Sequence, residues 1–92
     1  MAMYLMFGDY SLEGVKQVSA QRTKEATALI EKHGGKLVAG YAMLGKHDLL
    51  LIVELPSTGD AMRVSVGLSR KLGIAFTTAS AVTVKEFDKL MA

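Results

Sequence analysis

The fold is decided by one stretch near the middle of the chain, Asp48-Leu49-Leu50-Leu51-Ile52-Val53-Glu54-Leu55. The run is short and aliphatic, with Gly45 before it and Pro56 after it, which predicts a strand. Side chains alternate across a strand, so Val53 and the odd-numbered leucines share one face while Leu50 and Ile52 share the other. A strand that is apolar on both faces needs a cover on both sides.

Outward from this strand, the pattern predicts further elements on either side. Helical spacing of apolar residues, ended by the glycine pair Gly34-Gly35, predicts a first helix over 20–33. Ser57 is a plausible N-cap for a second helix, supported by Asp60 three residues later and ended by Gly73. Short apolar runs predict the remaining strands, at 3–7, 36–44 and 74–84. Residues 11–19 read as a loop or short helical turn, and 85–91 as a short terminal helix.

The predicted order is strand, helix, strand, strand, helix, strand, with the middle strands forming a hairpin. Two strand-helix-strand units joined in this way form the βαββαβ, ferredoxin-like arrangement. Right-handed crossovers place both helices on one face of a four-stranded antiparallel sheet. The predicted fold class is therefore α+β, and the length of 92 residues predicts a single domain over 1–92.

The second sheet face is also predicted to be apolar. In the first strand Met3, Leu5 and Phe7 oppose Tyr4 and Met6. In the second strand, strict alternation predicts two further rows, Leu37, Ala39, Tyr41 and Met43 against Val38, Gly40, Ala42 and Leu44. Only the fourth strand is less apolar, because it contains threonines, a serine and alanines.

Four strands of this kind would expose more apolar surface than a soluble monomer usually tolerates. One candidate cover is the C-terminal segment, but it carries only Phe87, Leu90 and Met91 as large apolar groups. The simpler cover is the sheet of a second copy, because most soluble oligomers are symmetric homomers. We therefore expect a homodimer or higher homo-oligomer that pairs sheet to sheet.

Composition excludes several classes of function. The net charge is +2, from 11 basic and 9 acidic residues, and no run of Lys or Arg suggests nucleic-acid binding. There is no cysteine, so disulfides and thiol chemistry are absent. The first ten residues do not read as a signal peptide, and the longest aliphatic run is too short to span a membrane. A cytoplasmic protein that binds neither nucleic acid nor membranes is expected.

Several motifs resemble those of the GYD-domain family. The segment 44–54 is similar to its signature, in which a glycine and one variable residue precede Tyr-Asp and an aliphatic strand ending in Val-Glu. The Ser11–Gly14 segment resembles the family's Thr-x-x-Gly, and Arg22 lies where the family often has arginine. Similar too are the glycine pair at 34–35, Tyr41, and the Thr-Thr-Ala-Ser-Ala stretch starting at residue 77. The main departure is His47, where the family usually has tyrosine.

The resemblance implies a ferredoxin-like fold that pairs as a dimeric α/β barrel, in agreement with the argument from the sheet. It implies no established activity or cofactor, because the family is largely uncharacterised.

The candidate site residues are Arg22, Tyr41, His47 and Asp48, which lie near the predicted sheet ends. His47 and Asp48 are neighbours at a strand start, so in an extended chain they point to opposite faces. The structural alternative is that Asp48 stabilises the turn and His47 partly fills a sheet end. Two histidines without a carboxylate cluster favour no metal site, and no cofactor motif stands out.

Three functions follow as hypotheses. The leading one is an oligomeric module that binds a small apolar or amphipathic molecule between sheet and helices or at the dimer seam. The second is a cofactor-independent enzyme, of oxygenase or isomerase type, with His47 as general base in a partly buried pocket. The third is a purely structural assembly part with no pocket.

Overall fold

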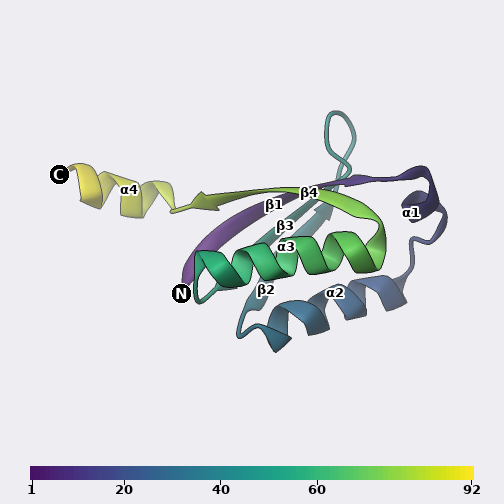
Figure 1. Ribbon diagram of the computed structural model, residues 1–92. Helices are drawn as coiled ribbons and strands as arrows, with labels where there is room; N and C mark the ends of the chain where they lie inside the picture. The colour runs from purple at the N-terminus through teal and green to yellow at the C-terminus, as the bar shows by residue number, and fades with distance from the viewer.

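The computed structural model describes all 92 residues as four strands and four helices. The four strands and the two long helices follow one another in the expected order, with a short helix before α2 and the expected terminal helix after β4 (Figure 1). Their bounds are β1 Ala2–Tyr10, α1 Leu12–Lys16, α2 Ala20–Lys32, β2 Lys36–Ala42, β3 Leu49–Leu55, α3 Thr58–Leu72, β4 Ile74–Ala81 and α4 Val84–Met91.

The four strands form one antiparallel sheet in the order β2-β3-β1-β4. The helices α2 and α3 lie side by side on one face of this sheet, so the body has two layers (Figure 1). This arrangement confirms the ferredoxin-like α+β fold expected from the sequence. None of the helices is long and apolar enough to cross a membrane.

The core lies between the helices and the sheet. The strand side contributes one row from each central strand, including Tyr4 and Met6 of β1 and Val53 of β3. From α3 come Ala61, Val64, Leu68 and Leu72, all at helical spacing. The predicted caps of α3 are confirmed, since the Ser57 side chain accepts from the Asp60 N–H and Gly73 ends the helix in a left-handed conformation, with φ of 67°.

Three predicted strand bounds are wrong by a few residues. The first strand continues to Tyr10 rather than ending at Phe7, because Gly8, Asp9 and Tyr10 all pair with β4. Strand β2 ends at Ala42 and β4 at Ala81, before the predicted ends at 44 and 84. In both cases the apolar run continues past the last residue that has a partner strand.

The prediction of strictly alternating side chains in β2 is also wrong. The register with β3 shifts between Leu37 and Ala39, which leaves Val38 as the extra residue of a β-bulge. Because of the bulge, Leu37 lies on the helix side while Ala39 and Tyr41 lie on the opposite side, opposite Ile52 and Leu50.

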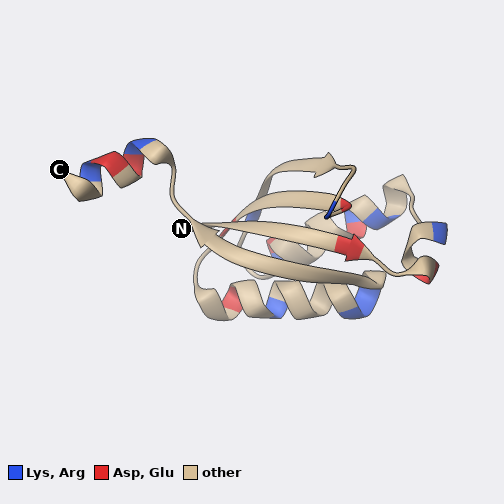
Figure 2. Ribbon diagram, turned by 90° about the horizontal axis from the view of Figure 1, so that it is seen from above, with Lys and Arg blue, Asp and Glu red and all other residues tan.

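The sheet face opposite the helices is uncovered. We call this the open face and define it by Met3, Leu5, Phe7, Ala39, Tyr41, Leu50, Ile52, Ala75, Thr77 and Ala79. Figure 2 shows that the strands carry almost no charged residues away from their ends. The terminal helix α4 extends away from the body, so it does not fold across the open face (Figures 1 and 2).

The turn between β1 and α2 is packed directly against the end of α3. The Ser11 N–H donates to the Gly73 carbonyl at 3.2 Å, and the Ser11 hydroxyl accepts from the Gly14 N–H at 2.9 Å. A Cβ at Gly14 would lie 2.8 Å from the Gly73 carbonyl oxygen. The Ser-x-x-Gly motif is therefore a close-packing device that joins α1 to α3.

We expect Gly14→Ala to lower the free energy of unfolding by about 1–3 kcal/mol, because the new methyl overpacks against backbone that has little room to move. Gly59→Ala is the matched control, since a Cβ there meets nothing closer than 3.6 Å. Urea denaturation at one protein concentration measures both. Equal midpoints for the two variants would contradict the close-packing role of Gly14.

Candidate functional site

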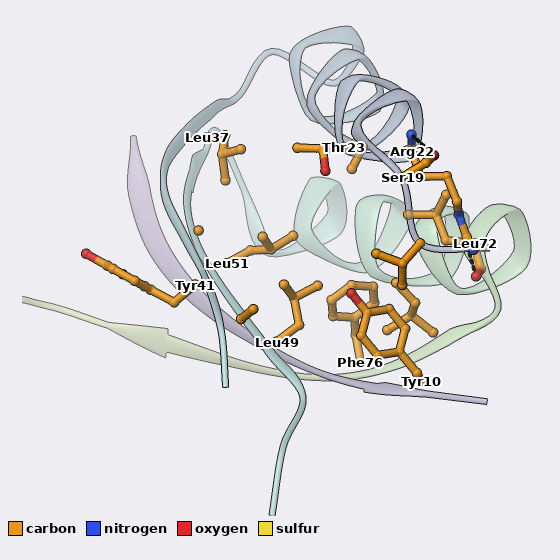
Figure 3. Close-up of a pocket in the computed structure, with 15 residues that line it drawn as sticks. Tyr10, Ser19, Arg22, Thr23, Leu37, Tyr41, Leu49, Leu51, Leu72 and Phe76 are labelled. Atoms are coloured by element: carbon orange, nitrogen blue, oxygen red, sulfur yellow. Dashed lines mark hydrogen bonds between the residues drawn. The ribbon is translucent and has the colours of Figure 1, made fainter. Parts of the chain in front are cut away.

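A cavity of about 320 Å³ lies between the sheet and the start of α2 (Figure 3). This volume is at the small end of the range of ligand pockets, about 300–1,000 Å³. Much of the space exists because the residues facing each other across it are small, namely Ala26 on α2 and Gly40 and Ala42 on β2. The remaining walls are mostly apolar, with Leu37, Leu49, Leu51, Leu72, Ile74 and Phe76 among them.

Tyr10 supplies a polar group to this otherwise apolar space. Its ring lies beside Phe76, and its hydroxyl points into the cavity (Figure 3). The backbone of Tyr10 is fixed from the other side, since its N–H donates to Asp48 Oδ2 at 2.9 Å. Ser19 and Thr23 add two more hydroxyls at the exposed edge near α2.

Arg22 lines the cavity, but its guanidinium is already engaged by backbone carbonyls. It donates to the Gly14 carbonyl at 3.1 Å and to the Leu72 carbonyl. These bonds tie the first turn of α2 to α1 and to the last turn of α3. The cationic group thus holds the cavity in shape, while its apolar stem forms part of the wall.

Tyr41 contributes to the cavity wall near its backbone, but its ring points away from the cavity (Figure 3). It lies opposite Leu50 on the open face and is 56% exposed. Of the four candidate site residues, Arg22 and Tyr41 are therefore adjacent to the cavity, and neither aims a free polar group into it.

His47 lies on the open face, in the loop between β2 and β3. Its Nδ1 is 3.2 Å and 3.3 Å from the two carboxylate oxygens of Asp9, and its ring packs on Phe7 with centroids 5.0 Å apart. A carboxylate at Nδ1 orients an imidazole and leaves Nε2 free, as in a general base. However, His47 lines neither this cavity nor the second one described below.

Asp48 does not share a site with His47. Its carboxylate accepts from the Tyr10 N–H, and its backbone N–H donates to the Gly8 carbonyl at 2.9 Å. The structure thus gives Asp48 a role in holding the loop against the end of β1, as the structural alternative in the sequence suggested. No three His, Asp or Glu side chains gather at metal-binding distance in the chain.

Two relevant residues, Asp9 and Tyr10, were not among the predicted site residues. Both residues could have been found from the sequence if the first strand had been predicted at its full length. Had the strand been extended past Gly8, alternation would have placed Tyr10 in the row of Tyr4 and Met6, toward the helices. The same count places Asp9 in the row of Phe7, on the face where His47 lies.

The fold and motifs together define the class of protein, a small ferredoxin-like domain. A model of the GYD domain matches residues 4–91, so the chain belongs to the GYD-domain family. No curated protein matches the chain in sequence.

Solved structures share the fold at low identity. The chain is similar to the leucine response regulatory protein LrpA of Mycobacterium tuberculosis, with 8% identity and a TM-score of 0.59 over 89% of this chain and 51% of that one. It is also similar to an AsnC family transcriptional regulator from Agrobacterium tumefaciens, with 18% identity and a TM-score of 0.58 over 89% and 50%. The chain spans about half the length of these proteins, and the likeness shows the fold alone.

We expect Arg22→Met to lower the free energy of unfolding by about 2 kcal/mol, because two carbonyls lose a charged donor. Arg63→Met is the control. Its guanidinium pairs with Asp60 at 3.1 Å but is 63% exposed, so its loss costs about 0.5 kcal/mol or less. Urea denaturation compares the two variants. A larger loss for Arg63→Met would contradict the bracing role of Arg22.

Proposed function

We propose that this chain is a homo-oligomeric module that binds a small, mainly apolar molecule in the cavity beneath α2. The observation that carries the proposal is the cavity itself, in which an apolar wall surrounds the inward-pointing Tyr10 hydroxyl. An apolar space with few polar groups is the usual composition of a small-molecule site. The ligand that fits is a compact ring or short branched chain with one hydroxyl or carbonyl to bond Tyr10.

The charge of the cavity narrows the ligand class further. Arg22 is its only cationic lining residue, and the guanidinium of Arg22 is spent on the Gly14 and Leu72 carbonyls. No acidic residue lines the wall. A neutral ligand is therefore favoured over a phosphate or a free carboxylate, whose charge would be buried without a partner.

Self-association through the open face is the second part of the proposal. The central rows of the open face, Leu5 with Ile52 and Phe7 with Leu50, are paired across neighbouring strands and form a continuous apolar surface. The paired area measures about 19 Å across four strands and about 23 Å along seven residues, from ordinary strand dimensions. Two such faces together give a footprint of about 900 Å², which is below the about 1,200–2,000 Å² of a standard specific interface and within the range of weak ones.

The other two hypotheses have less support. An enzyme with His47 as base is helped by the orienting Asp9 carboxylate, but His47 lines neither main cavity. A purely structural part would need no pocket, and this chain has one. Ligand binding with self-association accounts for both the cavity and the uncovered sheet.

Thr23→Phe is expected to weaken binding at least tenfold, because the exposed Thr23 lines the cavity and a phenyl ring there would fill it. Lys24→Phe is the matched control, since Lys24 is also exposed, lies one residue further along α2 and does not line the cavity. Two-dimensional NMR titration with phenol and indole measures binding, with shifts expected at Gly40 and Ala42. Shifts confined to the open face, or equal binding by both variants, would overturn the cavity proposal.

Ile52→Lys is expected to halve the mass measured by light scattering at micromolar concentration. The substitution places a charge at the centre of the open face, where a second sheet would bury it without a partner. Leu12→Lys is the control, because Leu12 is 87% exposed on α1 and off the sheet. A wild-type mass of 9.9 kDa, that of one chain, would rule out self-association.

A further inference from the structure

The terminal helix α4 is strongly amphipathic, and all of its residues are exposed in its own chain. Its large apolar side chains are Val84, Phe87, Leu90 and Met91, which are 51–76% exposed. At about 100° per residue they occupy one continuous side of the helix, while Lys85, Glu86, Asp88 and Lys89 occupy the other. An isolated helix of eight residues is marginal in water, so α4 needs a surface on which to bury this stripe.

A second cavity in the molecule, a groove between α3 and the edge strand β4, matches α4 in length. Its volume is about 300 Å³, and its walls run from Thr58 to Val66 on α3 and from Phe76 to Ser80 on β4. Eight residues of helix measure about 12 Å, and the nine residues of the α3 wall measure about 13.5 Å by the same rise. The five residues of the β4 wall measure about 17 Å, from the rise of a strand, so the groove is long enough for the whole of α4.

The groove also matches α4 in chemistry. Met62 and Val66 form an exposed apolar ridge along its α3 side, at 64% and 48% exposure. Four of its five hydroxyls are already paired with each other, since Ser65 Oγ lies 2.6 Å from Thr78 Oγ1 and the Tyr4 hydroxyl lies 3.3 Å from Thr58 Oγ1, while Ser80 is exposed at the groove's end. An apolar helix placed over these pairs would therefore leave few polar groups without partners.

We propose that α4 of one copy occupies the α3–β4 groove of a second copy, as an exchanged arm. Only Val82 and Thr83 join α4 to β4, and α4 is directed away from its own groove (Figures 1 and 2). Every copy supplies one arm and one groove, so reciprocal exchange between two copies is closed and symmetric.

The area buried by the arm contact indicates whether the arms alone could hold two copies together. A helix face of about 12 by 10 Å, counted on both surfaces and for both arms, gives about 480 Å². Specific interfaces bury about 1,200–2,000 Å², so the arms alone do not hold a stable dimer. The inference therefore rests on the proposed self-association, in which the arm contacts add to the about 900 Å² of the paired sheets and bring the total buried area into this range. The groove lies on the helix side of the sheet, so arm docking leaves the open face free.

The chain contains no cysteine, so introduced thiols report on the contact without background. The variant Met62→Cys with Phe87→Cys places one thiol on the groove ridge and one on the apolar stripe of α4. Treatment with a short bismaleimide is expected to give a covalent species of twice 9.9 kDa. Met62→Cys with Lys89→Cys is the matched control, because Lys89 lies on the polar side of α4, and it should cross-link at least fivefold less.

Two results would overturn the proposal. Cross-linking within a single chain, with both thiols consumed and the mass unchanged, would show that α4 docks in its own groove. Cross-linking no better than the control would show that α4 does not dock there at all. Val66→Cys with Leu90→Cys repeats the test with a second pair of exposed positions. Failure of the sheet pairing is seen separately, in the light-scattering mass of Ile52→Lys.

Discussion

The structure depends on the alternation of side chains in β1 and β3, the two central strands. In both strands the two rows are apolar, so the sheet separates two hydrophobic surfaces. In the row on the helix side, Met6 and Val53 are fully buried under α2 and α3. The row containing Leu5 and Ile52 has no cover within the chain, although its central residues Leu5, Phe7, Leu50 and Ile52 are as apolar as those of the core. The demand for a second cover, and with it the expectation of self-association, follows from this one constraint.

The helix side is closed at one end by hydrogen bonds from α2 and the α1 turn to the end of α3. Arg22 connects α2 to the carbonyls of Gly14 and Leu72, and Ser11 bonds the Gly73 carbonyl. These bonds hold the start of α2 in place over residues too small to fill the space beneath it. The cavity therefore results from two features together, the hydrogen bonds that hold α2 in place and the small side chains beneath it. Because these bonds prevent α2 from moving closer to the sheet, the space is not closed by tighter packing.

The candidate ligand site and the candidate general base lie on opposite faces of the sheet. The cavity with the Tyr10 hydroxyl is on the helix side, whereas His47 with Asp9 and Phe7 is on the open face. A second copy on the open face would bury surface near His47 but would leave the cavity entrance at Ser19 and Thr23 accessible. Ligand binding and assembly can therefore operate in the same molecule without competing for one surface.

The candidate site was harder to predict than the fold. The sequence indicated Arg22 and Tyr41 near a sheet end, and both adjoin the cavity. It did not indicate that the guanidinium of Arg22 is used by carbonyls, because those carbonyls belong to residues 8 and 50 positions away. Nor did it show that Tyr41 faces away from the helices, because a bulge at Val38 reverses the alternation that a regular strand would have.

The order of strands and helices, the caps of α3, the ferredoxin-like class and the two apolar faces of the sheet could all be predicted from residue spacing in the sequence. These properties are local, since they depend on the spacing of residues a few positions apart. Only the tertiary structure decided the pairing of His47 with Asp9, the direction of Tyr41, the cavity beneath α2 and the outward course of α4. Each of these depends on distances between residues far apart in the chain or on a local irregularity that periodicity does not reveal.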